Sequence, residues 1–273
     1  MIQSITSTQN PKIKQLLLLQ QKSSERRKSA LFVVEGRREL EHCIAAGYEV
    51  ECVFVNDELR MMNDEYSIIN HQSSIYSVSQ HVYERIAYRG STEGIIAIVR
   101  AQEHSLEDLL PALTGEGAGE GPLFVILESV EKPGNLGAVL RSADAAGATA
   151  VIVCDPLTDL YNPNLIRASI GACFTVPTVA CTSEECIRFL KDHGVQILTA
   201  QLQDSELYYD TDMTGPTAIV MGTESTGLTD LWRQAADAHI RIPMLGRLDS
   251  LNVSVSAAIL LFEAVRQRGI MGK

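Results

Sequence analysis

The sequence predicts an α/β protein of two domains, the second of which contains a parallel sheet. Short apolar runs alternate with segments of helical periodicity along most of the 273 residues. Residues 123–127, Leu-Phe-Val-Ile-Leu, are apolar at every position, which is typical of a parallel strand covered on both faces. With 45% apolar residues, the chain can bury one large core and one smaller core.

The first hundred residues predict the smaller α/β domain. A helix is expected to begin at Pro11, because polar residues precede it and proline suits a first helical turn. The basic run 22–28 is expected to end this helix. We expect strands at 31–34, 50–55, 75–78 and 94–99 and helices at 37–46 and 81–88.

Residues 103–121 predict a linker between the two domains. They end in a run of glycine and acidic residues without apolar periodicity. We therefore assign residues 1–102 to the amino-terminal domain and residues 122–273 to the carboxy-terminal domain.

The sequence of the carboxy-terminal domain predicts repeated strand–helix–strand units. The strands expected at 123–127, 217–221 and 239–242 are each followed by a polar loop that contains glycine. Because the carboxyl ends of parallel strands meet at one edge of a sheet, these loops are expected to form the ligand site. We expect further strands at 150–154, 174–176 and 195–200, and helices at 135–147, 164–170, 183–191 and from 252 onward.

The last helix is apolar on two sides. Val255 and Phe262 belong to one stripe, whereas Leu260, Leu261 and Ala264 belong to the other. Such a helix is covered twice, by its own sheet and by a further element such as a second subunit.

The polar residues of the loops permit a structural interpretation as well as a functional one. Asp249, Ser250 and Asn252 suit a helix cap, and so does Asn135. Arg141 lies among small residues that let a substrate approach, but it is also placed for an ion pair with Asp144.

The loop 222–228, Gly-Thr-Glu-Ser-Thr-Gly-Leu, offers backbone amides and Glu224 directly after a buried strand. It matches neither GxGxxG nor GxxxxGK[ST]. A dinucleotide or a nucleoside triphosphate is therefore not indicated.

Charge is distributed unevenly along the chain. The net charge is −11, yet residues 1–40 carry eight Lys or Arg residues against three Glu residues, a net +5. This asymmetry fits an anionic partner, and it fits a solvated helix face equally well.

No apolar run is long enough for a membrane span, and the first residues lack the order of a secretory signal, so we expect a cytoplasmic protein without a membrane partner. The six cysteines show no CxxC pair and no zinc-site spacing, so we expect buried reduced thiols and no metal.

Three segments occur in order at 135–141 (Asn-Leu-Gly-Ala-Val-Leu-Arg), 222–228 and 242–258 (from Ile-Pro-Met-Leu-Gly to Ser-Leu-Asn-Val-Ser-Val-Ser-Ala-Ala). Together they resemble the three motifs of the SpoU/TrmH family of RNA ribose 2′-O-methyltransferases, in the SPOUT superfamily. Residues 166–172 and 32–38 are also similar to that family. The run 131–133, Glu-Lys-Pro, departs from the acidic residue followed by proline that is commoner in the family at this point.

The resemblance implies a carboxy-terminal α/β domain with a trefoil knot and a small amino-terminal α/β RNA-binding domain that is ribosomal-protein-like. It implies an obligate homodimer and S-adenosyl-L-methionine as cofactor. The cofactor contacts of the family fall on Gly222, Ile242 and Leu251, largely through backbone groups.

The resemblance also implies the catalytic residues, which are Arg141, Asn135, Glu224, Ser250 and Asn252. A ribose hydroxyl is a poor nucleophile until its proton leaves or its developing charge is stabilised. Arg141 supplies positive charge and a planar fork that can hold an RNA phosphate. The proton acceptor is either Arg141 or that phosphate, and the very weak basicity of arginine favours positioning and charge stabilisation as the role of Arg141. The other four are expected to orient Arg141, the ribose and the cofactor.

The expected activity is methyl transfer to a ribose 2′-hydroxyl, in ribosomal RNA by analogy. The alternatives are a transfer RNA 2′-O-methyltransferase, a catalytically inactive RNA-binding protein, and an α/β enzyme acting on a small nucleotide.

Overall fold

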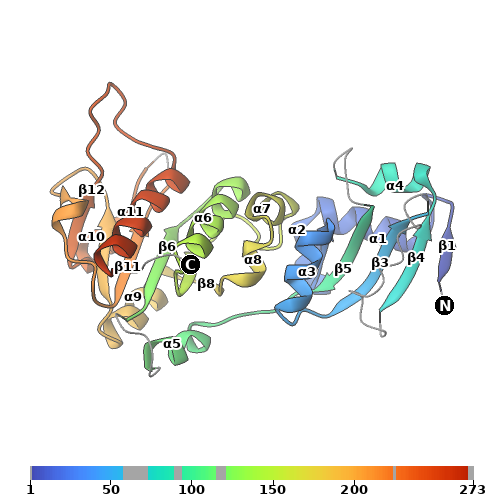
Figure 1. Ribbon diagram of the computed structural model, residues 1–273, viewed down its shortest axis with the longest axis horizontal. Helices are drawn as coiled ribbons and strands as arrows, with labels where there is room; N and C mark the ends of the chain where they lie inside the picture. Colours follow the sequence, from blue (N-terminus) through green and yellow to red (C-terminus); the bar gives the residue numbers. More distant parts are fainter. Residues whose placement is uncertain (1, 58–72, 89–93, 115–120, 224–225, 270–273) are drawn as a thin grey trace. The chain divides into compact units, whose positions relative to one another are not determined.

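The structure is a computed structural model that describes residues 2–57, 73–88, 94–114, 121–223 and 226–269 (Figure 1). Its internal contacts divide the chain into two compact units. Unit 1 comprises Met1–Gln102 and Asp159–Thr175, and unit 2 comprises Glu103–Thr158 and Val176–Lys273. Among the described residues, no helix combines the length and apolarity that crossing a bilayer requires.

Unit 1 contains a five-stranded mixed sheet with the order β1-β4-β3-β5-β2. β3 and β2 pair with β5 antiparallel, whereas β4 pairs parallel with β1 and β3. One cluster of buried side chains includes residues of α1 and α4, and another includes residues of α3, α7 and α8. The elements are β1 Gln3–Ile5, α1 Pro11–Gln21, α2 Ser23–Ser29, β2 Leu31–Glu35, α3 Arg37–Ala45, β3 Val50–Asn56, β4 Ser74–Val78, α4 Gln80–Ile86, β5 Ile95–Arg100, α7 Pro163–Ser169 and α8 Ala172–Thr175.

The basic run 22–28 does not simply end the first helix. α1 ends at Gln21, and the run then forms α2, which Ala30 ends in a left-handed conformation. Arg26 turns inward and is buried, and its guanidinium donates to Leu19 O at 2.5 Å and to Asp159 Oδ2 at 2.6 Å. Arg26 is therefore a structural residue, whereas Arg27 and Lys28 are exposed.

The strand expected at 174–176 is wrong. Residues 172–175 form α8 instead, and the strand β8 begins at Thr178. The reason is tertiary: the ring of Phe174 stacks on Phe32 with centroids 5.9 Å apart, within the core of unit 1. The segment Asp159–Thr175 accordingly belongs to unit 1 by its contacts.

Residues 106–114, which the sequence assigns to the linker, are helical. They form the 3₁₀ helix η2 Leu106–Leu109 and the helix α5 Leu110–Thr114. The side chains of Ser105 and Asp108 form a capping box, and Leu109 is buried in the core of unit 2. The leucines at helical spacing therefore decide the structure of residues 106–114, and the glycine-rich run that follows does not extend the linker back to residue 103.

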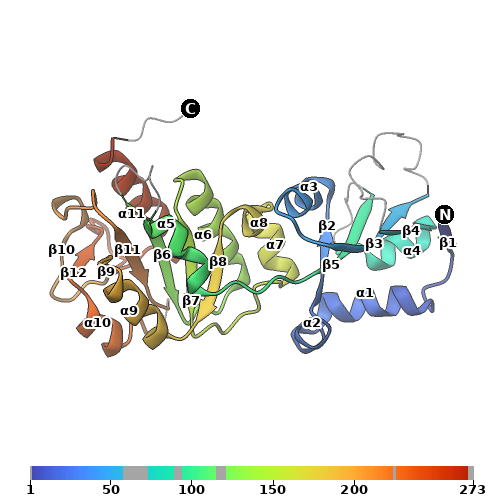
Figure 2. The same ribbon diagram turned by 90° about the horizontal axis from the view of Figure 1, so that it is seen from below.

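Unit 2 contains a seven-stranded sheet with the order β10-β12-β9-β11-β6-β7-β8, and all of its strand pairs are parallel. α9 and α10 cover one face, whereas α6 and α11 lie on the other (Figure 2). The parallel α/β prediction is confirmed. The elements are β6 Leu123–Glu128, α6 Pro133–Ala145, β7 Ala150–Cys154, β8 Thr178–Cys181, α9 Ser183–Asp192, β9 Gln196–Ala200, β10 Glu206–Leu207, η3 Tyr208–Asp210, β11 Thr217–Met221, α10 Asp230–Ala235, β12 Ala238–Arg241 and α11 Val253–Gln267.

α11 is anchored at its carboxyl end by a buried arginine. The Arg268 guanidinium donates to the carbonyl oxygens of Gly215 at 2.6 Å, Gly121 at 2.8 Å and Met213 at 2.9 Å. Gly121 precedes β6 and Gly215 precedes β11, so one side chain ties the helix to the starts of the two central strands.

We expect Arg268→Ala to lower the free energy of unfolding by about 2–4 kcal/mol, because it leaves several buried carbonyl groups without a charged donor. Urea denaturation measures this change. Arg188→Ala, on the exposed side of α9, is the matched control and should change the value by less than about 0.5 kcal/mol. Equal stabilities of the two variants would show that the Arg268 hydrogen bonds contribute nothing.

Candidate functional site

The candidate site lies where β6, β11 and β12 end. β6 and β11 are neighbours in register, with Leu127 beside Met221. Glu128, the last residue of β6, is buried and accepts hydrogen bonds from Thr229 N at 2.9 Å and Thr229 Oγ1 at 2.6 Å. These bonds fix the far end of the loop that follows β11.

The loop after β11 folds back tightly on itself. Thr223 and Gly227 exchange backbone hydrogen bonds of 3.2 and 3.1 Å. A Cβ atom on Gly222 would overlap the backbone of Gly227 and Leu228. Only glycine therefore permits this closure at position 222. Glu224 lies outside the described residues.

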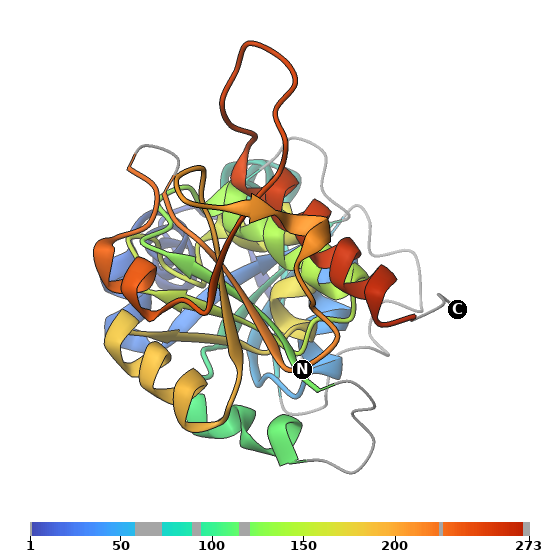
Figure 3. The ribbon, with the colours of Figure 1, turned by 90° about the vertical axis from the view of Figure 1, so that its left-hand side faces the viewer.

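The loop after β12 leads into α11, and it projects beyond the rest of unit 2 in Figure 3. The helix begins after Asn252, whose side chain accepts from Ser254 N at 3.0 Å and from Ser254 Oγ at 2.6 Å. The capping role of Asn252 is thus confirmed, but it is not the whole role. The Asn252 amide also donates to Asn135 Oδ1 at 3.2 Å, which links the first motif to the third.

Asn135 is not the cap of its own helix. α6 begins at Pro133 with Lys132 at the N-cap position, so Asn135 lies within the first turn. This position leaves its side chain able to bond Asn252.

Two cavities adjoin at these loops. The larger, of about 620 Å³, falls in the size range of small-molecule sites and has Gly222, Ile242, Ser250, Leu251 and Asn252 in its wall. The smaller, of about 110 Å³, includes Glu128 and Asn135. Both cavities share Gly222, Thr223 and Val253.

The larger cavity has polar atoms that suit a polar ligand. Gln201 Oε1 and Arg233 Nε are buried and have no hydrogen-bond partner in the described part of the chain, and both residues line this cavity. An unpaired buried acceptor and donor are costly unless a ligand satisfies them. The wall also contains apolar residues, among them Met221, Leu228 and Ile240, as is usual for a small-molecule site.

Arg141 lies on the same helix as Asn135 but not in the wall of either cavity. It lies about 9 Å along the axis of α6 from Asn135 and about 120° around it. Its exposed guanidinium makes no ion pair or hydrogen bond with a described residue, so the alternative pairing with Asp144 is not formed.

Four residues of the site are not predicted from the sequence: Glu128, Thr229, Gln201 and Arg233. Glu128 carries a signal, because it is a carboxylate directly at the end of an entirely apolar strand. The other three are ordinary polar residues in sequence, and only the folded chain brings them to the site.

Comparisons with known proteins agree with this geometry. A family model described as the SpoU rRNA Methylase family matches residues 122–262, and one described as an MRM3-like substrate binding domain matches residues 10–97. The 23S rRNA (guanosine-2′-O-)-methyltransferase RlmB of Yersinia pestis is 42% identical over 182 residues, which cover 66% of this chain and 73% of that protein.

Two solved structures are similar over almost the whole chain. A crystal structure of an RNA 2′-O ribose methyltransferase has a TM-score of 0.81 and 39% identity, covering 98% of this chain and 100% of that one. The AdoMet-bound rRNA methyltransferase from Sinorhizobium meliloti has a TM-score of 0.85 and 28% identity, covering 97% and 98%. Since the first family model spans more than half of the chain, and the Yersinia relative is matched over most of its length, the chain belongs to the SpoU rRNA methylase family.

Proposed function

We propose that the protein transfers a methyl group from S-adenosyl-L-methionine to a ribose 2′-hydroxyl of 23S ribosomal RNA, at a guanosine. The observation that carries this proposal is the pair of adjoining cavities, one large enough for the cofactor and the other beside Asn135. The Asn252–Asn135 hydrogen bond joins their walls. The name of the Yersinia relative supplies the RNA and the nucleotide.

The larger cavity is the proposed cofactor site. The backbone of Gly222, Ile242 and Leu251 would hold the nucleoside, and Gln201 and Arg233 would satisfy its polar groups. When bound there, the cofactor supplies an electrophilic methyl group on a sulfonium. The Sinorhizobium structure contains this cofactor.

The residues of the smaller cavity are proposed to hold the ribose. Asn135, fixed by Asn252, can bond the sugar hydroxyl, and Ser250 lines the adjoining wall. Arg141 stabilises the negative charge that develops on the 2′-oxygen and holds a neighbouring phosphate. We retain Glu224 as an orienting residue on the basis of the family resemblance alone.

A homodimer is part of the proposal. On α11, the side chains of Val255 and Phe262 are 46% and 49% exposed in the single chain, as the uncovered stripe of a two-sided helix would be. α6, which carries Arg141, packs beside α11. A second copy on this face would cover the stripe and bring Arg141 into a completed site. The trefoil knot is likewise proposed from the resemblance, supported by the two loops that wall one cavity.

Unit 1 is the proposed RNA-binding part, in keeping with the substrate-binding model that matches residues 10–97. Lys22, Arg27 and Lys28 are exposed on or next to α2 and can contact phosphates. The functional division into an RNA-binding and a methyltransferase domain rests on this assignment.

The test of the function is transfer of a radiolabelled methyl group to 23S ribosomal RNA, with transfer RNA as a second substrate. We expect labelling of one ribose in the 23S RNA, mapped by resistance of the adjacent linkage to alkali. Labelling of transfer RNA alone would favour a transfer RNA 2′-O-methyltransferase. Labelling of neither RNA would favour a catalytically inactive RNA-binding protein.

Arg141→Ala is expected to reduce methyl transfer about 100-fold or more, because it removes charge stabilisation in the transition state. Cofactor affinity should stay within about threefold, since Arg141 lines neither cavity. Calorimetric titration and the transfer assay measure the two quantities. The control Arg188→Ala should leave both unchanged, and retained turnover in Arg141→Ala would remove Arg141 from the mechanism.

Gly222→Ala is expected to weaken S-adenosyl-L-methionine binding at least about tenfold, because the added Cβ displaces the backbone at Gly227. Gly215→Ala is the matched control, since a Cβ there meets no atom within 4 Å. Calorimetry on both variants gives the comparison. Equal affinities would mean that this turn does not form the cofactor site.

Replacing Arg27 and Lys28 with glutamine is expected to weaken RNA binding. The slope of log affinity against log salt concentration should become shallower by about 0.7–0.9 for each phosphate that the variant no longer neutralises. Filter binding over a range of salt concentrations measures this slope. The same change at Arg188 and Lys191, exposed on α9 of unit 2, is the control. An identical slope in the two double variants would show that Arg27 and Lys28 are solvated surface residues that do not contact RNA phosphates.

A further inference from the structure

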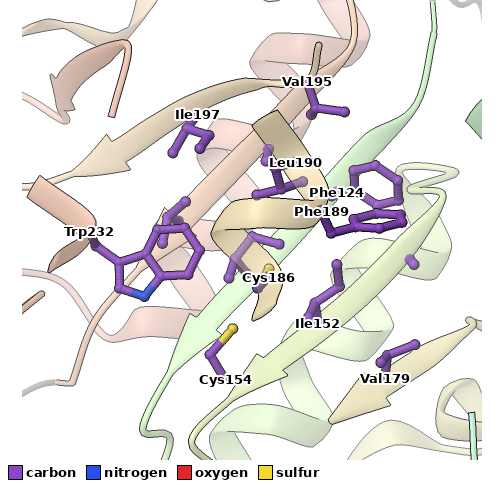
Figure 4. Packing of buried hydrophobic residues seen from close by; sticks show 14 of the residues in the cluster. Phe124, Ile152, Cys154, Val179, Cys186, Phe189, Leu190, Val195, Ile197 and Trp232 are labelled. Atoms are coloured by element: carbon purple, nitrogen blue, oxygen red, sulfur yellow. The ribbon is translucent and has the colours of Figure 1, made fainter. Parts of the chain in front are cut away.

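Three cysteines from separate elements of unit 2 meet at one point. Cys154 is the last residue of β7, Cys181 is the last residue of β8, and Cys186 lies on α9. Their three sulfur atoms all lie within 4.8 Å of one another. Figure 4 shows Cys154 and Cys186 in the core, beside Trp232.

The fold fixes this arrangement. Cys154 and Cys181 are direct partners in neighbouring parallel strands, so their side chains stand side by side on one face of the sheet. The turn into α9 is held by Asp155, which accepts from Ser183 N at 3.2 Å and from Ser183 Oγ at 2.6 Å. Trp232 Nε1 in turn donates to Ser183 Oγ at 3.0 Å. The helix therefore returns over the strand ends and places Cys186 against both.

The geometry suits a metal ion better than a disulfide between the strand cysteines. Partners in neighbouring strands have Cβ atoms separated by about the strand spacing of 4.8 Å, whereas a disulfide requires about 3.8 Å. A metal–thiolate bond of about 2.3 Å places three sulfur atoms about 4 Å apart around one ion, which the observed limit of 4.8 Å accommodates.

We propose that Cys154, Cys181 and Cys186 form a three-thiolate site for a thiophilic d¹⁰ cation, Zn²⁺ or Cu⁺. Each thiol gives up its proton to solvent when the ion binds. Three sulfur donors complete a trigonal Cu⁺ site, and Cys181, which is partly exposed, leaves room for a water molecule as fourth ligand of Zn²⁺. Asp155 and Glu185, next to Cys154 and Cys186 in sequence, add negative charge that favours a cation.

The site is separate from the candidate active site, because none of the three cysteines lines either cavity. The proposed metal site departs from the sequence-based expectation that the six cysteines are buried reduced thiols and bind no metal. The separations of 27 and 5 residues match no metal motif, and only the register of β7 with β8 unites them.

The test is metal binding by the full chain, reduced and stripped of metal. Zn²⁺ is titrated in competition with a chromophoric zinc chelator, and Cu⁺ in a separate arm with a Cu⁺-specific chelator. We expect the unaltered chain to bind one equivalent of the ion in at least one arm. Cys181→Ser should bind that ion at least about tenfold more weakly than the unaltered chain does. Cys173→Ser, which removes a partly exposed thiol from unit 1, is the matched control and should bind as the unaltered chain does.

A second readout does not depend on the folding of a variant. In the unaltered chain, the bound ion should protect Cys181, the partly exposed thiol of the cluster, from a thiol-reactive dye and should raise the unfolding temperature. Absence of stoichiometric binding in both arms, or equal affinity in Cys181→Ser and Cys173→Ser, would overturn the proposal and leave three buried thiols that only fill the core.

Discussion

α11 is held at both of its ends, and the candidate site depends on that constraint. At the carboxyl end, the buried guanidinium of Arg268 bonds the chain just before β6 and just before β11. At the amino end, Asn252 caps the helix and bonds Asn135 of α6. The helix therefore spans unit 2 from the starts of the central strands to their ends, and it fixes where the last loop meets the first.

The parallel sheet supplies the rest of the site. Because β6 and β11 run in the same direction and in register, Glu128 and the Gly222 turn emerge side by side. The bond between Glu128 and Thr229 then closes the loop after β11 over the end of β6. The wall of the larger cavity therefore comes from strand ends and from the loops that follow them, and it combines apolar and polar residues, as is usual for a small-molecule site.

Much of the fold can be predicted because three neighbouring strands of the parallel sheet, β6, β7 and β11, are short runs of almost entirely apolar residues. That feature alone locates β6, β7 and β11 to within a residue. Prediction fails where distant residues decide the outcome. Phe174 is helical because it stacks on Phe32, and Arg26 is buried because it pairs with Asp159, which lies 133 residues further along the chain.

The residues of the candidate site can be predicted from the sequence for a different reason. Gly222, Asn135 and Asn252 belong to segments whose order and spacing resemble one family, and the structure brings them together. Arg141 shows where such reasoning stops, because the single chain leaves it on the outside of both cavities. The thiol cluster gives no signal at all in the sequence, since strand register rather than sequence spacing creates it.

The proposed function depends above all on the loops after β11 and β12 binding the cofactor together. Hydrogen exchange followed by mass spectrometry, with and without S-adenosyl-L-methionine, tests whether they do. We expect slower exchange in both segments, residues 221–229 and 240–253, and unchanged exchange in unit 1. Protection confined to one loop, or found only outside both, would contradict this joint role.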